Sequence, residues 1–186
     1  MISSLFMATI SLTVYGPLLM YIIFGAKPLV AGYIIALESL GWTTVAISTS
    51  GVSLRVEPRL IRLGSILVSI SMVGLIYAMP SGPLWLIALL STIMGMGFGM
   101  SWSFVSKRII ANVSEAELTR ASASIPTFMR VSMALGSALS GIIANFAGFS
   151  EESSVEVAKN VAFWCFAAFV PLILVGLFTA WRVSRK

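Results

Sequence analysis

Six apolar stretches, each about as long as a membrane-spanning helix, constrain the fold of this chain more than any other feature. A helix needs about 20 mainly apolar residues to cross a bilayer, and it satisfies its own backbone hydrogen bonds there. The predicted spans cover about residues 3–24, 29–50, 63–80, 83–105, 121–148 and 160–181. Charged residues make up only 10% of the chain, against about 25% in soluble domains. We therefore predict an all-α integral membrane protein, with residues 1–186 forming a single six-helix transmembrane domain.

The segments between the spans carry turn-forming and charged residues, as loops outside a bilayer do. They read GAKP at 25–28, RVEPRLIR at 55–62, PSGP at 80–83, SKRIIANVSEAELTR at 106–120 and SEESSVEVAKN at 150–160. The spans and loops together predict six crossings, so the two termini should lie on the same side of the membrane.

The distribution of basic residues predicts which side that is. If the N-terminus is cytoplasmic, only Lys27 and Lys159 fall in outside loops. The inside loops and tail then hold Arg55, Arg59, Arg62, Lys107, Arg108, Arg120, Arg182, Arg185 and Lys186. Because cytoplasmic loops are enriched in Lys and Arg, both termini are predicted to be cytoplasmic. The basic residues are spread over several loops, which argues against a nucleic-acid partner.

Six spans divide into two sets of three that start on opposite sides of the membrane. Inverted-topology repeats, which are common in secondary transporters, have this arrangement. The first set ends at Pro80 and the second begins at Pro83. The two sets have no convincing sequence similarity, so this prediction rests on topology.

Several kinds of chemistry are disfavoured by what the sequence lacks. It has no histidine and one cysteine, Cys165, within an apolar run. It contains no glycine-rich GxxxxGK[ST] loop for ATP phosphates, no metal-ligand cluster and no catalytic dyad. We expect neither a cofactor nor a metal, and we do not expect an enzyme.

Glu38 is a carboxylate near the middle of the second predicted span. At 1.5 Å per residue it lies about 13 Å from the outer end of that helix. A charge at the centre of a span costs about 2.5–3.5 kcal/mol on insertion scales, and such residues usually face a protein interior or an aqueous cavity. One interpretation is a proton-coupling site or a contact for a cationic substrate. The others are a structural partner for Arg130 or for hydroxyl groups, or a carboxyl that burial keeps protonated.

Arg130 lies at a similar depth, about 13 Å from the inner end of the fifth span. It follows Pro126 by four residues, which places both on one helical face with Thr127 and Ala134. Arg130 is either an anion site or gate residue that faces a partner half, or a side chain whose long stem snorkels toward the inner surface.

Aromatic and proline residues add a second group of candidates. Tyr15, Tyr21, Trp42 and Trp102 offer aromatic surface that a lipophilic cation could use. Pro17 removes a backbone hydrogen bond within the first span and is expected to kink it. Kinked spans often border the substrate site of transporters, although membrane helices also tolerate proline without such a role.

Small residues recur at spacings of four in two spans. Gly95 and Gly99 have this spacing in the fourth span, and Ser132, Gly136 and Ser140 have it in the fifth. Such patterns allow helices to approach closely, so we predict a packing role for these residues.

Two segments carry motifs of a known family. YGPLLMYIIFGAKPLVAGY, at 15–33, has Pro17, Gly25, Pro28, Ala31 and Gly32 at matching positions. It resembles the first helix, outer loop and second-helix start in the C-terminal half of major facilitator superfamily transporters, most closely the multidrug-efflux branch of drug:proton antiporters. ASASIPTFMRVSMALGSALSGIIANFAG, at 121–148, resembles the eleventh helix of that branch. There an arginine is followed by G-x-A-x-x-G, matched here by Gly136, Ala138 and Gly141.

The cytoplasmic loop after the second span departs from the family pattern G-x-x-x-D-R-x-G-R-R. GVSLRVEPRL keeps Gly51 and Arg59. It has Arg55 at the aspartate position and Pro58 at the second glycine. The departure puts a charge-relay role of this loop in doubt, but not the fold.

The resemblance implies one six-helix half of a transporter whose substrate cavity lies between two halves. The chain would be a truncated gene, a fragment or a half-size subunit, and its partner a second six-helix half. The helices of Glu38 and Arg130 would then border the cavity and contact the other half, which disfavours a direct Glu38–Arg130 pair.

The implied activity is proton-coupled efflux of small amphipathic compounds by alternating access, in the plasma (inner) membrane of a bacterium. The family's proton-coupling residues commonly lie in the other half. The alternatives are a nontransporting accessory or scaffold subunit and an inactive truncated fragment.

Overall fold

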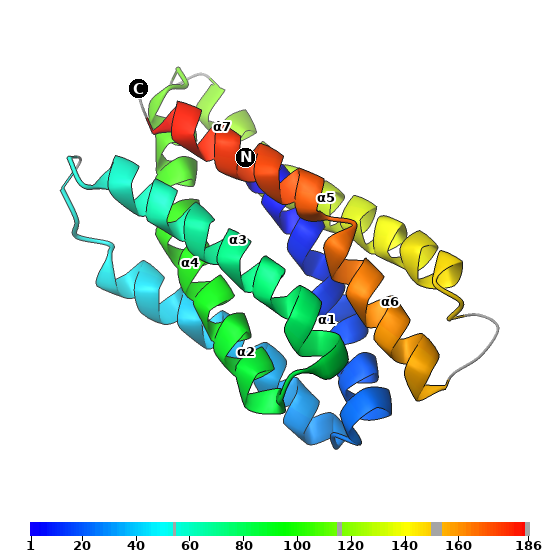
Figure 1. The fold of residues 1–186 in the computed structure, drawn as a ribbon. Coiled ribbons are helices and arrows are strands. Elements are labelled where there is room, and N and C mark those ends of the chain that lie inside the picture. The colour runs from blue at the N-terminus through cyan, green and yellow to red at the C-terminus, as the bar shows by residue number, and fades with distance from the viewer. Residues whose placement is uncertain (54, 115–116, 150–153, 185–186) are drawn as a thin grey trace.

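The computed structural model describes residues 1–53, 55–114, 117–149 and 154–184, which form a helical bundle (Figure 1). Within these residues, seven helices make six spans that are long and apolar enough to cross a membrane. They are α1 (Ile2–Phe24), α2 (Pro28–Ser48), α3 (Glu57–Ser81), α4 (Leu84–Ala111), α5 (Leu118–Phe146), α6 (Val155–Ala167) and α7 (Val170–Val183), with α6 and α7 sharing the last span. The predicted all-helical fold with six apolar helices of membrane-spanning length is confirmed.

The turn between α1 and α2 follows from two residues of the GAKP segment. Gly25 ends α1 with a φ of 63°, a left-handed conformation that favours glycine. Its N–H donates to the Tyr21 carbonyl at 3.0 Å. Pro28 then occupies the first turn of α2, where a missing N–H has no cost.

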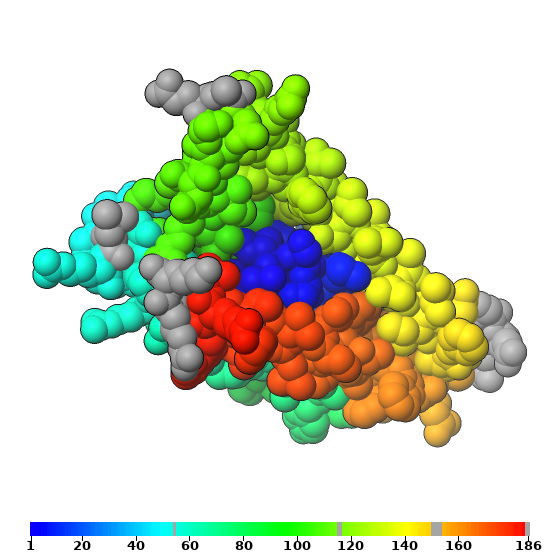
Figure 2. All heavy atoms as spheres, turned by 90° about the horizontal axis from the view of Figure 1, so that it is seen from above, coloured from blue at the N-terminus to red at the C-terminus, as the bar shows by residue number. Residues whose placement is uncertain are grey.

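The bundle is built around α1 and α4. Helix α4 packs along α2 on one side and α3 on the other, while α1 packs against α5, α6, α7 and α2. The start of α1 lies in the centre of one end of the bundle, encircled by α4, α5 and α7 (Figure 2). That end also carries Arg62, Arg108 and Arg182, and we call it the basic end.

Close contact between α4 and its neighbours depends on glycines. A Cβ on Gly95 would overlap the backbone carbonyl of Glu38 in α2, and one on Gly99 would lie 2.5 Å from the Trp42 carbonyl oxygen. On the opposite face of α4, a Cβ on Gly97 would lie 2.6 Å from the Gly64 carbonyl oxygen in α3. The α4 glycines therefore let α4 approach two helices at once.

Helix α5 packs on α1 through one stripe of small residues. Its buried positions are Ser132, Gly136, Ser140 and Ala144. A Cβ on Gly136 would lie 2.5 Å from the Met7 carbonyl oxygen, and the Ser140 and Ser11 hydroxyls share a hydrogen bond of 2.7 Å. The rest of α5 is largely exposed, as is most of α2.

Two helices differ from the predicted spans. Helix α3 begins at Glu57 rather than near residue 63, because Pro58 sits in its first turn, and Pro80 lies inside the helix. The last span is broken at Ala168 and Phe169, and Pro171 occupies the first turn of α7. Pro17 lies within α1, which remains one helix.

Candidate functional site

Four aromatic side chains from three helices pack into one cluster. Phe6 of α1 stacks on Phe98 of α4 with ring centroids 4.8 Å apart. Trp42 of α2 stacks on Phe98 at 5.4 Å. Trp102, one turn beyond Phe98, meets Phe6 edge-on at 5.6 Å and Trp42 at 6.5 Å. We call these four residues the aromatic cluster.

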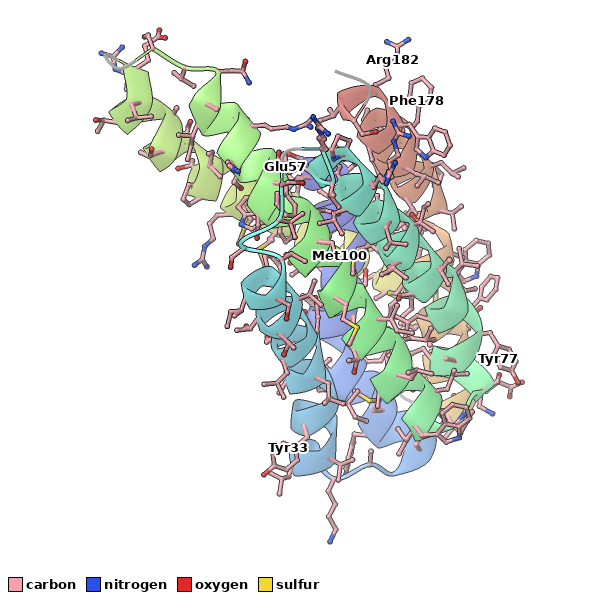
Figure 3. All side chains as sticks on the ribbon, turned by 90° about the vertical axis from the view of Figure 1, so that its left-hand side faces the viewer. Tyr33, Glu57, Tyr77, Met100, Phe178 and Arg182 are labelled. Carbon is pink, nitrogen blue, oxygen red and sulfur yellow. The ribbon has the colours of Figure 1, made fainter. Side chains whose placement is uncertain are left out.

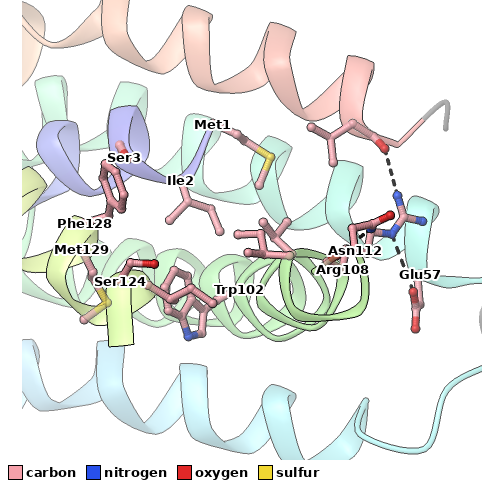
Figure 4. A pocket seen from close by; sticks show the side chains of 14 residues that line it. Met1, Ile2, Ser3, Glu57, Trp102, Arg108, Asn112, Ser124, Phe128 and Met129 are labelled. Atoms are coloured by element: carbon pink, nitrogen blue, oxygen red, sulfur yellow. Dashed lines mark hydrogen bonds and ion pairs between the residues drawn. The ribbon is translucent and has the colours of Figure 1, made fainter. Parts of the chain in front are cut away.

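Trp102 also lines a cavity of about 940 Å³ at the basic end (Figure 4). The cavity lies among the start of α1, the end of α4, the first half of α5 and the end of α7. Ile2, Phe128 and Met129 contribute apolar surface. Glu57, Arg108 and Asn112 contribute polar groups. This is the size and mixed lining of sites that bind small organic molecules.

Glu38 lies beside the aromatic cluster. It precedes Trp42 by four residues in α2, about 6 Å along the helix axis and on the same face. Its backbone is held against Gly95 of α4, and the residue is half-buried. Among the described residues, no hydrogen bond or ion pair to the Glu38 carboxylate is present. A carboxylate beside tryptophan faces is suited to a cation.

Arg130 faces away from the bundle. It is exposed and precedes the buried Ser132 by two residues, a rotation of about 200° around α5. Within the described part of the chain it has no ion pair. The Glu38–Arg130 ion pair that their similar depths would allow is therefore not formed.

The two tyrosine candidates lie elsewhere. Tyr15 packs edge-on against Phe149, with centroids 6.1 Å apart, and a Cβ on Gly141 would lie 3.6 Å from its hydroxyl. It is about 13 Å along α1 from Phe6. Tyr21 is 58% exposed. The structure thus brings Glu38, Trp42 and Trp102 together but leaves Tyr15 and Tyr21 apart from them.

The structure also reveals a buried carboxylate at the basic end. Glu57, in the first turn of α3, is 2% exposed. One of its oxygens lies 2.8 Å from Lys107 Nζ, and the other lies 3.8 Å from Arg108 Nε. Arg108 also donates to the Val183 carbonyl at 2.9 Å. These contacts join α3, α4 and α7 (Figures 3 and 4).

Of the residues compared with the family's loop pattern, Gly51 and Arg55 precede α3, and Arg59 lies in its first turn, so the prediction that Arg59 is in a loop is wrong. Gly51, Arg55 and Arg59 are exposed. In the described part of the chain, neither arginine forms an ion pair. The described residues also contain no group of three or more His, Cys, Asp or Glu side chains that could hold a metal.

The chain is similar to two curated proteins from Mycobacterium tuberculosis, strains CDC 1551 and H37Rv, each named a probable multidrug-efflux transporter. It is 26% identical to each over 167 residues, which cover 86% of this chain. The aligned region is 34% of each relative, so the chain spans about a third of the length of the curated relatives it matches. No family model matches the chain, and no solved structure matches it. The helical spans and these relatives support an integral membrane protein related to transporters.

Proposed function

We propose that this chain is one half of a proton-coupled efflux transporter of the major facilitator type, with two inverted three-helix repeats. It pairs with a second six-helix half and exports small amphipathic compounds by alternating access. The basic end faces the cytoplasm of a bacterial cell, and the bundle lies in its plasma (inner) membrane. The proposal rests on the exposure of Arg130, which lies near the middle of α5.

An arginine at the centre of a span costs about 2.5–3.5 kcal/mol on insertion scales when it meets lipid. Arg130 has no partner carboxylate within the described residues and faces away from the bundle. A second half, or an aqueous cavity between two halves, would remove that cost. The relatives are about three times as long as the aligned segment, which leaves room for such a half.

The cavity and the aromatic cluster support small amphipathic compounds as the class of substrate. A compound that enters the cavity from the basic end meets Trp102, and behind it Trp42. Glu38 lies one turn further along α2. The cavity itself is lined by apolar side chains, by Trp102 and by the paired Glu57 and Arg108. The tryptophans, and behind this lining the Glu38 carboxylate, which has no ion pair among the described residues, together favour an amphipathic cation. Glu38 then serves as the group that exchanges a cation for a proton.

Transport by reconstituted protein tests this function. The chain is placed in liposomes with an imposed pH gradient, alone and with any six-span protein that copurifies with it, and movement of tetraphenylphosphonium is followed. We expect gradient-driven movement by the pair. Glu38→Gln should change its pH dependence or remove cation transport without affecting membrane insertion, whereas Glu117→Gln, at an exposed loop carboxylate, should behave as wild type.

If neither preparation moves the probe, the transport proposal fails, and an accessory or scaffold role becomes the better interpretation. If the pair transports and Glu38→Gln is unchanged in rate and pH dependence, Glu38 has only a structural role.

A further inference from the structure

An arginine cluster lies where α3 and α7 meet at the basic end, on surface that the proposed transport cycle does not use. We define it as Arg62 of α3, which contacts α7, together with Arg59 in the first turn of α3 and Arg182 in the last turn of α7. Figure 3 shows Arg182 and Phe178 at this end of the bundle, on the side away from α2. Arg59 lies one turn before Arg62 on the same side of α3.

The Arg62 guanidinium is held in one orientation by α7. Its Nε donates to the Ser184 hydroxyl, and its Nη2 donates to the Ser184 carbonyl at 3.1 Å. The guanidinium also lies over the Trp181 ring, 5.4 Å from the centroid. An arginine has five N–H donors, so three remain after these two bonds. A planar guanidinium that is held in one orientation is suited to donate hydrogen bonds to phosphate oxygens.

Over residues 1–53, 55–114, 117–149 and 154–184, no carboxylate neutralises the positive charge of the cluster. Glu57 is the acidic residue closest to Arg59 in sequence, but its carboxylate is buried against Lys107 and Arg108. Among the described residues, none of the three arginines in the cluster has an ion-pair partner. The cluster therefore complements an anion.

The surface beside the arginines is apolar. Arg182 lies over the Phe178 ring, 5.3 Å from its centroid. Leu63 and Ile70 of α3 and Leu174 and Phe178 of α7 are exposed. Trp181, next to Arg182, is a side chain typical of the membrane–water boundary. The surface thus offers charge at the headgroup level and an apolar strip that continues toward the bilayer core.

We propose that the α3–α7 edge binds the phosphate of an anionic phospholipid, with Arg62 as the fixed donor and Arg59 and Arg182 adding charge. The acyl chains lie along the exposed apolar residues of α3 and α7. Basic pockets between helices near a membrane surface bind anionic headgroups in this manner. The site does not depend on a second half or on transport.

Lipid-dependent stability of the purified full chain in a nonionic detergent tests the proposal. Melting temperature is measured against added dioleoylphosphatidylglycerol, dioleoylphosphatidylcholine or inorganic phosphate. We expect phosphatidylglycerol to raise the melting temperature in a saturable way, and the other two additions to have little effect. Arg182→Gln and Arg62→Gln should each weaken the apparent affinity for phosphatidylglycerol about fivefold, the value of one basic residue near an anionic surface.

Two variants separate lipid binding from structural effects. Arg120→Gln removes an exposed arginine of α5 outside the cluster and should keep the wild-type lipid response. Within the described part of the chain, the Arg182 side chain makes no hydrogen bond, so Arg182→Gln should fold even if Arg62→Gln does not. Equal stabilisation by phosphatidylcholine, an equal effect of free phosphate, an unchanged affinity in Arg182→Gln, or an equal loss in Arg120→Gln would each overturn the proposal.

Discussion

At the scale of single residues, the buried carboxylate of Glu57 links α3 to α4 through Lys107 and Arg108. Glu57→Gln keeps the shape of the side chain but removes its charge from between Lys107 and Arg108. Lys107 is 57% exposed, so solvent screens part of the attraction. We therefore expect the free energy of unfolding to fall by about 1–2 kcal/mol, below the range for fully buried pairs. Denaturant titration in detergent measures this change.

Glu117→Gln is the matched control for Glu57→Gln. The Glu117 carboxylate is exposed and accepts one hydrogen bond, from Ser114 at 3.0 Å. Its loss should change the free energy of unfolding by less than about 0.5 kcal/mol. Equal effects of the two substitutions would show that burial of Glu57 adds nothing to stability.

The aromatic cluster gives a second prediction at this scale. Trp102→Ala removes the ring that lies between the cavity and Trp42. If the cluster binds a lipophilic cation, the dissociation constant of tetraphenylphosphonium should rise about tenfold, within the range of cation–π energies. Equilibrium dialysis with the purified chain measures this constant. Trp85→Ala, which removes an exposed tryptophan from the first turn of α4, should leave it unchanged. A similar loss in both variants would contradict the assignment.

Sequence reasoning identified Trp42, Trp102 and Glu38 as candidates but missed Phe6, Phe98 and Glu57. Phenylalanines are common in apolar spans, and nothing local distinguishes those that touch across helices. The sequence predicts Glu57 in the loop RVEPRLIR, at 55–62, because that segment carries charged and turn-forming residues. The signal that could have placed it in a helix was Pro58, a residue favoured in the first turn.

At the scale of helices, the contact between α2 and α4 depends on Gly95. In Gly95→Ala the new methyl group would overlap the Glu38 carbonyl, and backbone atoms cannot yield as a flexible side chain can. We expect a loss of about 1–3 kcal/mol in the free energy of unfolding, as for overpacked cores. Denaturant titration again provides the measurement.

Gly32→Ala is the control for this substitution, since nothing lies within 4 Å of a Cβ there. Alanine has the higher helix propensity, so this variant should be as stable as wild type or more stable. Destabilisation by Gly32→Ala as large as that by Gly95→Ala would attribute the effect to loss of glycine in general rather than to the contact.

Helix positions followed from hydropathy more reliably than helix ends did. Apolar length marks the part of a helix within hydrocarbon, whereas α3 continues to Glu57 and α4 to Ala111, in polar sequence. The break at Ala168 and Phe169 lies within an unbroken apolar run, so hydropathy could not reveal it. Pro171 was its local signal.

At the scale of the whole molecule, helix order in space was the least predictable property. Most spans are apolar around much of their circumference, because lipid and protein neighbours are equally apolar. The small-residue stripe of Ser132, Gly136 and Ser140 did indicate the packed face of α5, and Arg130 falls opposite to it. Identifying α1 as the helix that this stripe contacts required the structure.

The exposed faces of α2 and α5 lead to a prediction about assembly. If a second half covers them, nitroxide labels at Leu40→Cys in α2 and Val131→Cys in α5 should lose accessibility to dissolved oxygen when the partner is present. These side chains are 61% and 51% exposed in the chain alone. Cys165 is the only native cysteine and is buried, so each added cysteine can be labelled selectively. Electron paramagnetic resonance power saturation in liposomes measures the change.

A label at Ile70→Cys in α3 is the control, because this side chain is 56% exposed and α3 packs against α4, α6 and α7 rather than α2 or α5. Its oxygen accessibility should stay the same with and without the partner. Protection at Ile70 but not at Leu40 or Val131 would place the partner on α3 and leave Arg130 facing lipid. Because that arrangement keeps the energetic cost of an intramembrane arginine, it would contradict the proposed pairing of two halves.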